Sequence, residues 1–274
     1  MRVADWIQKT EALLAEAGIV AARTEAQILA AEAAGKDRTW AVTHPEAEID
    51  PAAADPLRER RLAREPLAYI LGRREFFGRE FRVTPDVLIP RHETECVVEA
   101  ALDWVPADRA RVLDLGTGSG CIGISLALER PGWSVTVSDV SPNAIRIAEE
   151  NAGRLGARVL PTLSDLFDDL PTGPFDAIVT NPPYVEDGAR LEPEVGRFEP
   201  AVALFAGADG LNVYRRIAEE AGGHLAPGGI LIAEVGDGQA TAVGRIFAES
   251  GWNLVEQRTD LGGTARVLVF SPSA

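Results

Sequence analysis

Residues 112–120 have the sequence Val-Leu-Asp-Leu-Gly-Thr-Gly-Ser-Gly, in which a short apolar run leads directly into closely spaced glycines. The apolar run predicts a buried strand. Glycines at 116, 118 and 120 allow tight backbone turns and the close approach of a ligand to the start of the following helix. Asp139 ends the next predicted strand, about 20 residues further on, where a carboxylate can accept both hydroxyls of a ribose. The combination predicts a site for a nucleotide-like cofactor at residues 116–120, called the glycine loop below.

A second stretch with specific chemistry is Asn181-Pro182-Pro183-Tyr184, called the proline corner below, which follows a predicted buried strand over residues 175–180. Each proline fixes its own φ and restricts the residue before it, so the corner is stiff and extended. The Pro182 carbonyl and the Asn181 amide oxygen place two acceptors side by side, which suits a planar –NH2 group. Tyr184 adds an aromatic face for a flat amide or base. Taken alone, these four residues also fit an ordinary structural turn.

Two cofactors fit the glycine loop. Gly118, Gly120 and Gly123 match the G-x-G-x-x-G pattern of dinucleotide sites, and Asp139 suits the ribose of NAD and of S-adenosylmethionine equally. Hydride transfer usually needs a proton donor near the substrate, but the three histidines (His44, His92 and His224) all lie outside the stretch around the proline corner. A Ser-His-Asp or thiol–histidine nucleophile is not indicated either. A corner that grips an amide favours methyl transfer to nitrogen, and therefore S-adenosylmethionine.

Strand and helix patterns alternate through the second part of the chain, from residue 112 onward. Such alternation predicts a parallel sheet with helices on both faces. The last two predicted strands, residues 252–257 and 266–270, are joined by a short turn at Gly262-Gly263. A short turn joins neighbouring antiparallel strands, so we expect an antiparallel pair at one edge of the sheet.

The first part of the chain has a different pattern of apolar residues. Residues 1–65 show helical spacing of apolar residues and predict a separate helical unit. A predicted helix over residues 52–64 carries Arg58, Arg60, Arg61 and Arg64, which fit either a solvated face or a surface for a macromolecular partner. In residues 66–95, aromatic residues surround Gly78 and predict a hairpin that links the two parts.

The composition narrows the class of protein. Hydrophobic residues at 46% and charged residues at 25% are ordinary for a soluble globular chain. A formal net charge of -15 argues against a protein that follows a phosphate backbone. Cys96 and Cys121 are not spaced as a metal clip and cannot form a disulfide framework, and we expect no metal. The sequence also shows no membrane-spanning run and no signal peptide, which predicts a cytoplasmic protein.

Several stretches together resemble a known family. The glycine loop with Asp114 and Leu115, Asp139 and the proline corner resemble class I S-adenosylmethionine-dependent methyltransferases. Further stretches narrow the likeness to the release-factor glutamine methyltransferase family (HemK/PrmC): Pro66-Leu67-Ala68-Tyr69-Ile70-Leu71-Gly72, Glu75-Phe76-Phe77-Gly78, Val87-Leu88-Ile89-Pro90-Arg91-His92-Glu93-Thr94-Glu95, Glu199-Pro200, Ala206-Gly207-Ala208-Asp209-Gly210-Leu211 and Leu225-Ala226-Pro227-Gly228-Gly229. The resemblance covers nearly the whole chain and is specific from about residue 64 onward.

The resemblance implies a fold and a reaction. The fold is a Rossmann-like α/β domain over residues 96–274, with a seven-stranded, mostly parallel sheet and an antiparallel edge strand. A helical substrate-recognition domain (1–65) and a hairpin linker (66–95) precede it. The family methylates the side-chain amide nitrogen (N5) of the glutamine in the Gly-Gly-Gln loop of peptide chain release factors, and S-adenosylmethionine becomes S-adenosylhomocysteine. Direct binding of nucleic acid is not expected.

The resemblance also assigns residues. Gly116, Thr117, Gly118, Ser119, Gly120, Asp139, Leu166 and Asn181 would contact the cofactor, and Asn181, Pro182, Pro183 and Tyr184 would hold the substrate amide. Leu166 stands where the family commonly has a tryptophan beside the adenine, and His92 stands where it usually has a proline. The alternative function is a nucleic-acid N-methyltransferase, because exocyclic amino groups of adenine or guanine fit the same corner.

Overall fold

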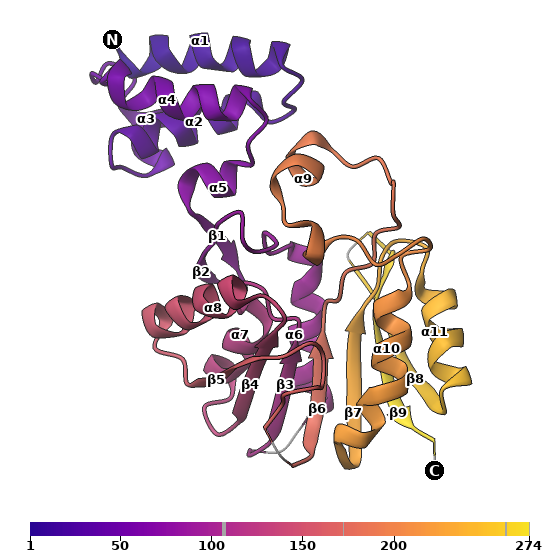
Figure 1. Cartoon of the computed structure of the whole chain (residues 1–274). Coiled ribbons are helices and arrows are strands. Elements are labelled where there is room, and N and C mark those ends of the chain that lie inside the picture. The colour runs from indigo at the N-terminus through magenta and orange to yellow at the C-terminus, as the bar shows by residue number, and fades with distance from the viewer. Residues whose placement is uncertain (106–107, 172, 261, 274) are drawn as a thin grey trace. The chain divides into compact units, whose positions relative to one another are not determined.

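The computed structural model describes residues 1–105, 108–171, 173–260 and 262–273 (Figure 1). The chain divides into two compact units. The helical unit comprises Met1–Gly72 and Leu191–Phe198, and the sheet unit comprises Arg73–Arg190 and Glu199–Ala274. The chain therefore leaves the sheet unit shortly after the proline corner, adds a short segment to the helical unit, and returns at Glu199.

Among the described residues, seven strands form one sheet in the order β5-β4-β3-β6-β7-β9-β8 (Figure 1). The strands are β3 (Arg111–Leu115), β4 (Ser134–Asp139), β5 (Val159–Leu163), β6 (Phe175–Thr180), β7 (Leu225–Glu234), β8 (Trp252–Thr259) and β9 (Ala265–Pro272). Strands β3 to β7 pair in parallel, whereas β9 is antiparallel to both β7 and β8. The predicted mostly parallel sheet with an antiparallel edge is confirmed, and β8 is the edge strand on that side.

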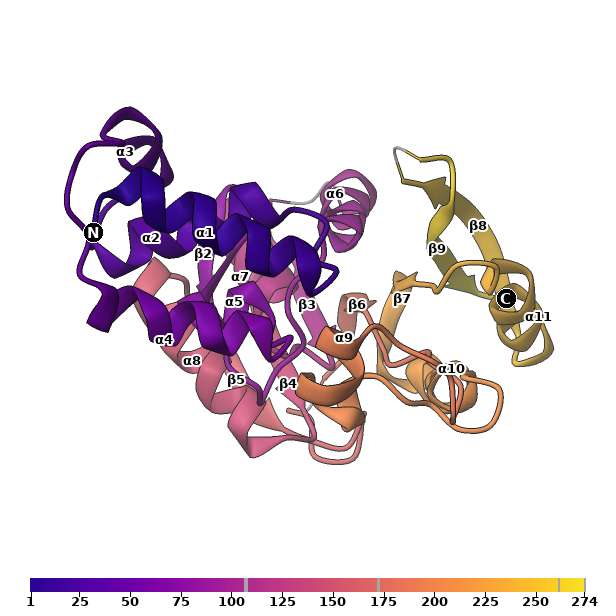
Figure 2. The ribbon, with the colours of Figure 1, turned by 90° about the horizontal axis from the view of Figure 1, so that it is seen from above.

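Helices cover both faces of this sheet (Figures 1 and 2). One face packs against α6 (Glu95–Trp104), α7 (Cys121–Glu129) and α8 (Pro142–Leu155), and the other against α10 (Asn212–Glu220), η3 (Ala221–His224) and α11 (Ala240–Glu249). Successive side chains of a strand point to opposite faces, and β3 shows this directly. Val112 belongs to the first core, whereas Leu113 and Leu115 belong to the second.

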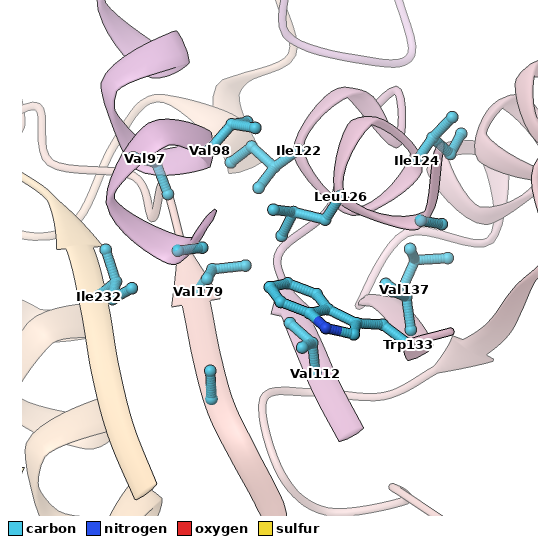
Figure 3. Packing of buried hydrophobic residues seen from close by; sticks show 14 of the residues in the cluster. Val97, Val98, Val112, Ile122, Ile124, Leu126, Trp133, Val137, Val179 and Ile232 are labelled. Carbon is cyan, nitrogen blue, oxygen red and sulfur yellow. The ribbon is translucent and has the colours of Figure 1, made fainter. Parts of the chain in front are cut away.

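The first of these cores lies between the sheet and α6, α7 and α8 (Figure 3). Figure 3 shows valines of α6 and aliphatic side chains of α7 facing the strands, together with the indole of Trp133. Trp133 is 5% exposed and Leu126 is fully buried. A fully buried aliphatic side chain contributes about 1.5–3 kcal/mol to stability, so this core fixes the strands whose ends carry the site.

The helical unit has a core of its own around Trp6, Leu14 and Leu29, which are all fully buried. Its helices are α1 (Val3–Glu16), α2 (Ala22–Ala33), α3 (Arg38–Thr43), α4 (Pro51–Leu62), α5 (Leu67–Leu71) and α9 (Pro193–Phe198). The start of α4 follows the usual chemistry, because the Asp50 carboxylate accepts the backbone N–H of Ala52 at 2.9 Å and Pro51 occupies the first turn.

The arginines of α4 are used inside the helical unit, which neither sequence-based interpretation anticipated. Arg58 and Arg61 are 7% and 5% exposed. Arg61 bridges Glu25 at 2.5 Å and Glu194 of α9 at 3.0 Å. Arg64 also bridges Glu194, at 2.8 Å. The two ion pairs of Glu194 fasten the inserted segment 191–198 to the end of α4.

The predicted hairpin is confirmed as β1 (Arg73–Phe76) paired with β2 (Arg79–Arg82), and it belongs to the sheet unit. Its turn needs left-handed backbone at two adjacent residues, and Phe77 and Gly78 have φ of 50° and 71°. The side-chain amide of Asn151 in α8 accepts from Arg82 N at 2.7 Å and donates to Ser119 O at 2.9 Å. A buried amide therefore ties the hairpin directly to the glycine loop.

Within the described ranges, none of the helices combines the length and the apolar character needed to cross a lipid bilayer.

Candidate active site

A cavity of about 380 Å³ opens in the sheet unit at the carboxyl ends of β3, β4 and β6. Ligands of open α/β sheets bind at this end of the strands. Its wall includes residues of the glycine loop, the segment before α6, the end of β4, the segment after β5 and the proline corner: Gly116, Thr117, Gly118, Ser119, Asp139, Leu166, Asn181 and Pro183 are among them. Gly120, Pro182 and Tyr184 lie beside this wall rather than on it. The structure thus brings both predicted motifs to one place.

The three glycines of the loop are required for different structural reasons. Gly116, Gly118 and Gly120 all have positive φ, at 72°, 54° and 83°. A Cβ on Gly116 or Gly118 would meet nothing within 4 Å, which leaves their backbone open to a ligand. A Cβ on Gly120 would lie 2.6 Å from Ile124 Cδ1 and 3.2 Å from Ala148 Cβ. Gly120 therefore lets the start of α7 pack against α8, and the first two glycines form the accessible part of the loop.

Asp114 holds the glycine loop together from inside. Its Oδ2 accepts the hydroxyl of Thr117 at 2.5 Å and the backbone N–H of Gly123 at 2.8 Å, so one carboxylate joins the loop to the first turn of α7. Asp114 is fully buried, and its Oδ1 has no hydrogen-bond partner. Burial, only partly opposed by these hydrogen bonds, raises the pKa of Asp114 to about 6.

Asp139 lies at the end of β4, where the sequence predicted it. Its Oδ2 accepts the N–H of Gly118 at 2.9 Å and its Oδ1 accepts the N–H of Ser141 at 2.9 Å. Burial raises the pKa of Asp139, and these backbone hydrogen bonds oppose the rise. A carboxylate oxygen has more than one lone pair, so both oxygens can still accept from a ligand in the cavity. The predicted ribose contact stays a prediction.

Leu166 lines the cavity with its backbone held in an uncommon conformation. Its φ of 50° is in the left-handed region, which is rare for a residue with a branched side chain. The Ser164 hydroxyl donates to Leu166 O at 2.9 Å and accepts from Asp169 N at 3.1 Å, so a buried serine stabilises this turn. The leucine offers an apolar face at the position where the resemblance places an adenine.

The proline corner is positioned by hydrogen bonds on both sides. Thr180 Oγ1 donates to Leu115 O at 2.8 Å, which joins the end of β6 to the start of the glycine loop. Asn181 Nδ2 donates to Thr94 Oγ1 at 3.2 Å, which leaves Oδ1 as the remaining hydrogen-bonding atom of the amide. Pro182 is buried, and among the described residues no hydrogen bond to its carbonyl oxygen is found. The corner therefore has two acceptors, of which the one on Asn181 belongs to a residue that lines the cavity.

Tyr184 supports the corner from the protein side. Its carbonyl oxygen accepts from Gln239 Nε2 at 2.9 Å, and its ring lies so close to Gly236 that a Cβ there would be 2.9 Å from Cδ2. Burial raises the pKa of the Tyr184 hydroxyl, so it stays protonated at neutral pH. The predicted stacking of Tyr184 on a substrate stays a prediction.

Glu199 fastens another part of the cavity wall, and in the sequence analysis it appears only as part of the resemblance. It is 7% exposed, and its carboxylate accepts from Arg91 Nη2 at 2.5 Å and from Ile89 N at 3.3 Å. These contacts connect the segment before α6 with η2 (Ala201–Ala203), which also lines the cavity. The local sequence, a glutamate beside a proline in a loop, does not indicate that Glu199 makes these contacts.

The hairpin region also brings together Glu75, His92 and Glu95, with one ligand atom of each within 4.8 Å of the others. The two carboxylates already have a structural use. Glu75 accepts the N–H of Gly78 at 2.7 Å, and Glu95 accepts the N–H of Phe77 at 3.0 Å. These bonds stabilise the hairpin turn, and we assign no metal to the cluster.

Comparisons with known proteins agree with this geometry. The family model of the methyltransferase small domain matches residues 98–198, and that of the PrmC N-terminal domain matches residues 5–72. The release factor glutamine methyltransferase of Bordetella pertussis is 46% identical over 261 residues, which cover 93% of this chain and 96% of that protein. The enzyme of the same name from Geobacter sulfurreducens is 44% identical over 272 residues, covering 97% of this chain and 94% of that one.

Among solved structures, a 16S rRNA methyltransferase from T. Thermophilus in complex with AdoMet and guanosine has a TM-score of 0.53 and 20% identity, over 74% of this chain and 50% of that one. At this identity the likeness shows the fold alone. The curated relatives match at far higher identity and over almost their whole length. On that ground, this chain belongs to the release factor glutamine methyltransferase family.

Proposed function

We propose that this chain transfers the methyl group of S-adenosylmethionine to the side-chain amide nitrogen (N5) of the glutamine in the Gly-Gly-Gln loop of peptide chain release factors. The observation that carries the proposal is the proline corner on the wall of a cavity that the glycine loop also lines. A corner with two acceptors and a loop with open backbone meet there, as methyl transfer to an amide requires. The family of the chain supports the same reaction.

The residues of the cavity fit S-adenosylmethionine. Gly116 and Gly118 leave their backbone open, Asp139 offers carboxylate oxygens at the end of β4, and Leu166 offers an apolar face. We infer that the loop binds the methionine end, Asp139 the ribose and Leu166 the adenine. When bound, the cofactor would supply a methyl group on a positively charged sulfur, which is electrophilic. The product would be S-adenosylhomocysteine.

The protein's task follows from the weakness of the nucleophile. An amide nitrogen attacks poorly because its lone pair is delocalised into the carbonyl. Asn181 Oδ1 and the Pro182 carbonyl oxygen would accept both N–H groups of the glutamine and fix the direction in which the nitrogen points. The same dipoles favour positive charge as it develops on that nitrogen. No strong base is needed, because a methylated amide nitrogen loses its extra proton easily.

We assign recognition of the release factor to the helical unit, because it carries none of the residues that line the cavity. The inserted segment 191–198 belongs to that unit and follows the proline corner in the chain, so the recognition surface includes it. Release factors act during translation, and we place the enzyme in the cytoplasm. The net charge of -15 disfavours a nucleic acid as the alternative substrate.

A side-by-side methylation assay tests the function. Purified chain and labelled S-adenosylmethionine are offered a release factor, the same factor with its loop glutamine changed to glutamate, and RNA or DNA containing adenine and guanine. We expect label on the unmodified release factor alone. Label on nucleic acid with none on the release factor would overturn the proposal in favour of the alternative. Transfer to the glutamate variant would show that the amide is not the acceptor.

A further inference from the structure

Behind the proline corner, three polar side chains follow one another into the interior. Asn181 Nδ2 donates to Thr94 Oγ1 at 3.2 Å. The Thr94 side chain also lies close enough to the Glu234 carboxyl for a side-chain hydrogen bond that lowers the pKa of Glu234. Thr94 and Glu234 are each 2% exposed. They come from the segment before α6 and from the end of β7, so separate elements meet behind the corner. Asn181 and Thr94 also reach the cavity wall, whereas Glu234 does not.

The side chains of Asn181, Thr94 and Glu234 are called the row below. The order of hydrogen-bond donors along the row decides which end of the Asn181 amide is left for a ligand. A side-chain amide has a donor end and an acceptor end of nearly the same shape, and a hydroxyl can pair with either. An ionised carboxylate only accepts, so it takes the single hydroxyl hydrogen of Thr94. Thr94 then has only lone pairs left for Asn181, which must turn its –NH2 toward Thr94. The amide oxygen is thereby left for the substrate.

We propose that Thr94 and Glu234 are positioning residues, which fix the side-chain amide of Asn181 with its oxygen available to the –NH2 group of the substrate glutamine. The inference rests on the proposed role of Asn181 and adds the reason why that amide has one orientation. The reversed orientation would present the Asn181 –NH2 to the substrate –NH2. Two donors would then face each other, and the grip would be lost.

The surroundings of Glu234 favour a role beyond packing. One of its carboxylate oxygens has no hydrogen-bond partner, although the side chain is almost fully buried. A buried carboxylate that is only partly paired is unfavourable for stability, so a purely structural site would be better served by an apolar residue. Tyr214 of α10 donates to the backbone oxygen of Glu234 at 2.8 Å, which fixes the end of β7 without using the carboxylate.

The row also predicts a pH dependence. Burial raises the pKa of Glu234 to about 7, and the negative charge of Glu93 adds to the rise. The hydrogen bond from Thr94 and the positive charges of Arg266 and Arg91 lower this pKa but do not outweigh burial. The other titratable groups that sense this carboxylate are Tyr184, Tyr214, Cys96 and Cys121, and their pKa values are all raised, away from neutrality. Protonated Glu234 can donate to Thr94, which frees the Thr94 hydrogen for Asn181 Oδ1. The rate should therefore fall as the pH drops through the pKa of Glu234.

The test measures single-turnover methyl transfer on the full-length enzyme at saturating release factor and cofactor. Glu234→Gln keeps the shape but can donate as well as accept, and Thr94→Val keeps the shape but removes the hydroxyl. Each should lower the rate by about 10- to 100-fold, as expected for a misplaced reacting group, with cofactor Kd unchanged. Thr94→Ser restores the hydroxyl and should recover most of the rate lost in Thr94→Val. A structural role alone would not give this rescue at unchanged cofactor Kd.

The pH profile supplies the second measurement. In the wild type the single-turnover rate should show an inflection near neutral pH, which Glu234→Gln should abolish. His92→Asn, at an exposed histidine outside the row, should keep it. If Glu234→Gln and Thr94→Val transfer at the wild-type rate while Asn181→Ala is slow, the inference fails and the proposed function stands. If Asn181→Ala is also fast, the proposed grip itself has failed.

Discussion

Buried charge is handled in opposite ways in the two units. In the helical unit the buried charges are cationic and paired with anions: Arg61 contacts both Glu25 and Glu194. In the sheet unit the buried carboxylate of Glu199 is paired with Arg91, but two other buried carboxylates lack enough partners. Within the described parts of the chain, the buried carboxylate oxygens without a hydrogen bond are Asp114 Oδ1 and Glu234 Oε2, and both belong to the sheet unit.

The difference separates structural polar groups from those that prepare a site. A closed ion-pair network fixes the packing of helices and leaves nothing over for a ligand. Carboxylates that are buried and underpaired have raised pKa values, and such groups gather where binding or catalysis needs them. Asp114 holds the glycine loop and Glu234 lies behind the proline corner, so both underpaired carboxylates stand directly behind the proposed cofactor and substrate sites.

The largest expected effect is on the sheet unit's chemistry. Asn181→Ala removes one preorganised acceptor from the proline corner but leaves the prolines and the glycine loop in place. Loss of such a group typically lowers kcat by about 10²–10³-fold. Most cofactor binding should persist, and the folding transition should remain close to that of the wild type. Single-turnover transfer to a release factor, with calorimetry for the cofactor, measures both.

The matched control is Asn143→Ala. Asn143 is an exposed asparagine of α8 whose amide donates to Asp86 at 3.0 Å, near the cavity but outside the corner. Its loss should leave kcat nearly unchanged. A wild-type rate for Asn181→Ala would reduce residues 181–184 to a structural turn, and an equal loss in both variants would point to a general effect on the cavity.

The second-largest expected effect is on the stability of the helical unit, and it should leave the methyl-transfer chemistry unchanged. Arg61→Met removes the cation from a buried network and leaves Glu25 and Glu194 without it, which destabilises a protein by about 3 kcal/mol. Arg23→Met is the matched control, because Arg23 pairs with Glu11 at 3.0 Å on the surface with 70% of its side chain exposed. An exposed pair contributes about 0–1 kcal/mol. Urea unfolding should separate the two variants.

Cofactor affinity completes this comparison. It should be the same in Arg61→Met, Arg23→Met and the wild type wherever the protein is folded, because the residues around Asp139 belong to the other unit. Equal stability of the two variants would show that the network of Arg61 is no stronger than a surface pair. A large loss of cofactor affinity in Arg61→Met would contradict the separation of roles between the units.

The sequence predicts the sheet unit better than the helical unit, because the site of the sheet unit requires particular residue types. Close ligand approach demands glycine, and a stiff corner demands proline, so both motifs are recognisable from residue types alone. The fourth strand is predicted at residues 175–180, where β6 lies, because a buried parallel strand is a continuous apolar run that ends at the prolines. Leu166 could be placed from the resemblance, but its left-handed φ could not.

Other contacts depend on residues that are distant in sequence. Thr94 meets Asn181 across the sheet unit, and Arg61 meets Glu194 through a segment inserted far downstream. No local pattern marks such pairs, because each residue type is ordinary at its own position. The charged run on α4 looked like a surface for this reason, and only the position of α9 shows that Arg61 is enclosed.

The smallest expected effect is a difference in pH dependence between the units. Asp114 has a folded pKa of about 6 against an ordinary value of 3.8, so between these values the unfolded chain loses a proton that the folded chain keeps. Its contribution to stability is therefore favourable at low pH and declines as the pH rises. For Glu194, burial would raise the pKa, but hydrogen bonds from its backbone, Arg61 and Arg64 outweigh burial and lower it. Its contribution is present above its ordinary pKa of 4.5 and is lost as the pH falls.

Asp114→Asn and Glu194→Gln test this contrast, with urea unfolding of the cofactor-free protein at several pH values. The stability of Asp114→Asn relative to the wild type should rise by about 1 kcal/mol between about pH 5 and pH 7.5, because only the wild type ionises a buried group there. The stability lost in Glu194→Gln should be constant over the same range and shrink at more acidic pH. A pH-independent difference for Asp114→Asn would mean that this carboxyl does not titrate with a raised pKa. The contrast between an underpaired site and a closed network would then rest on geometry alone.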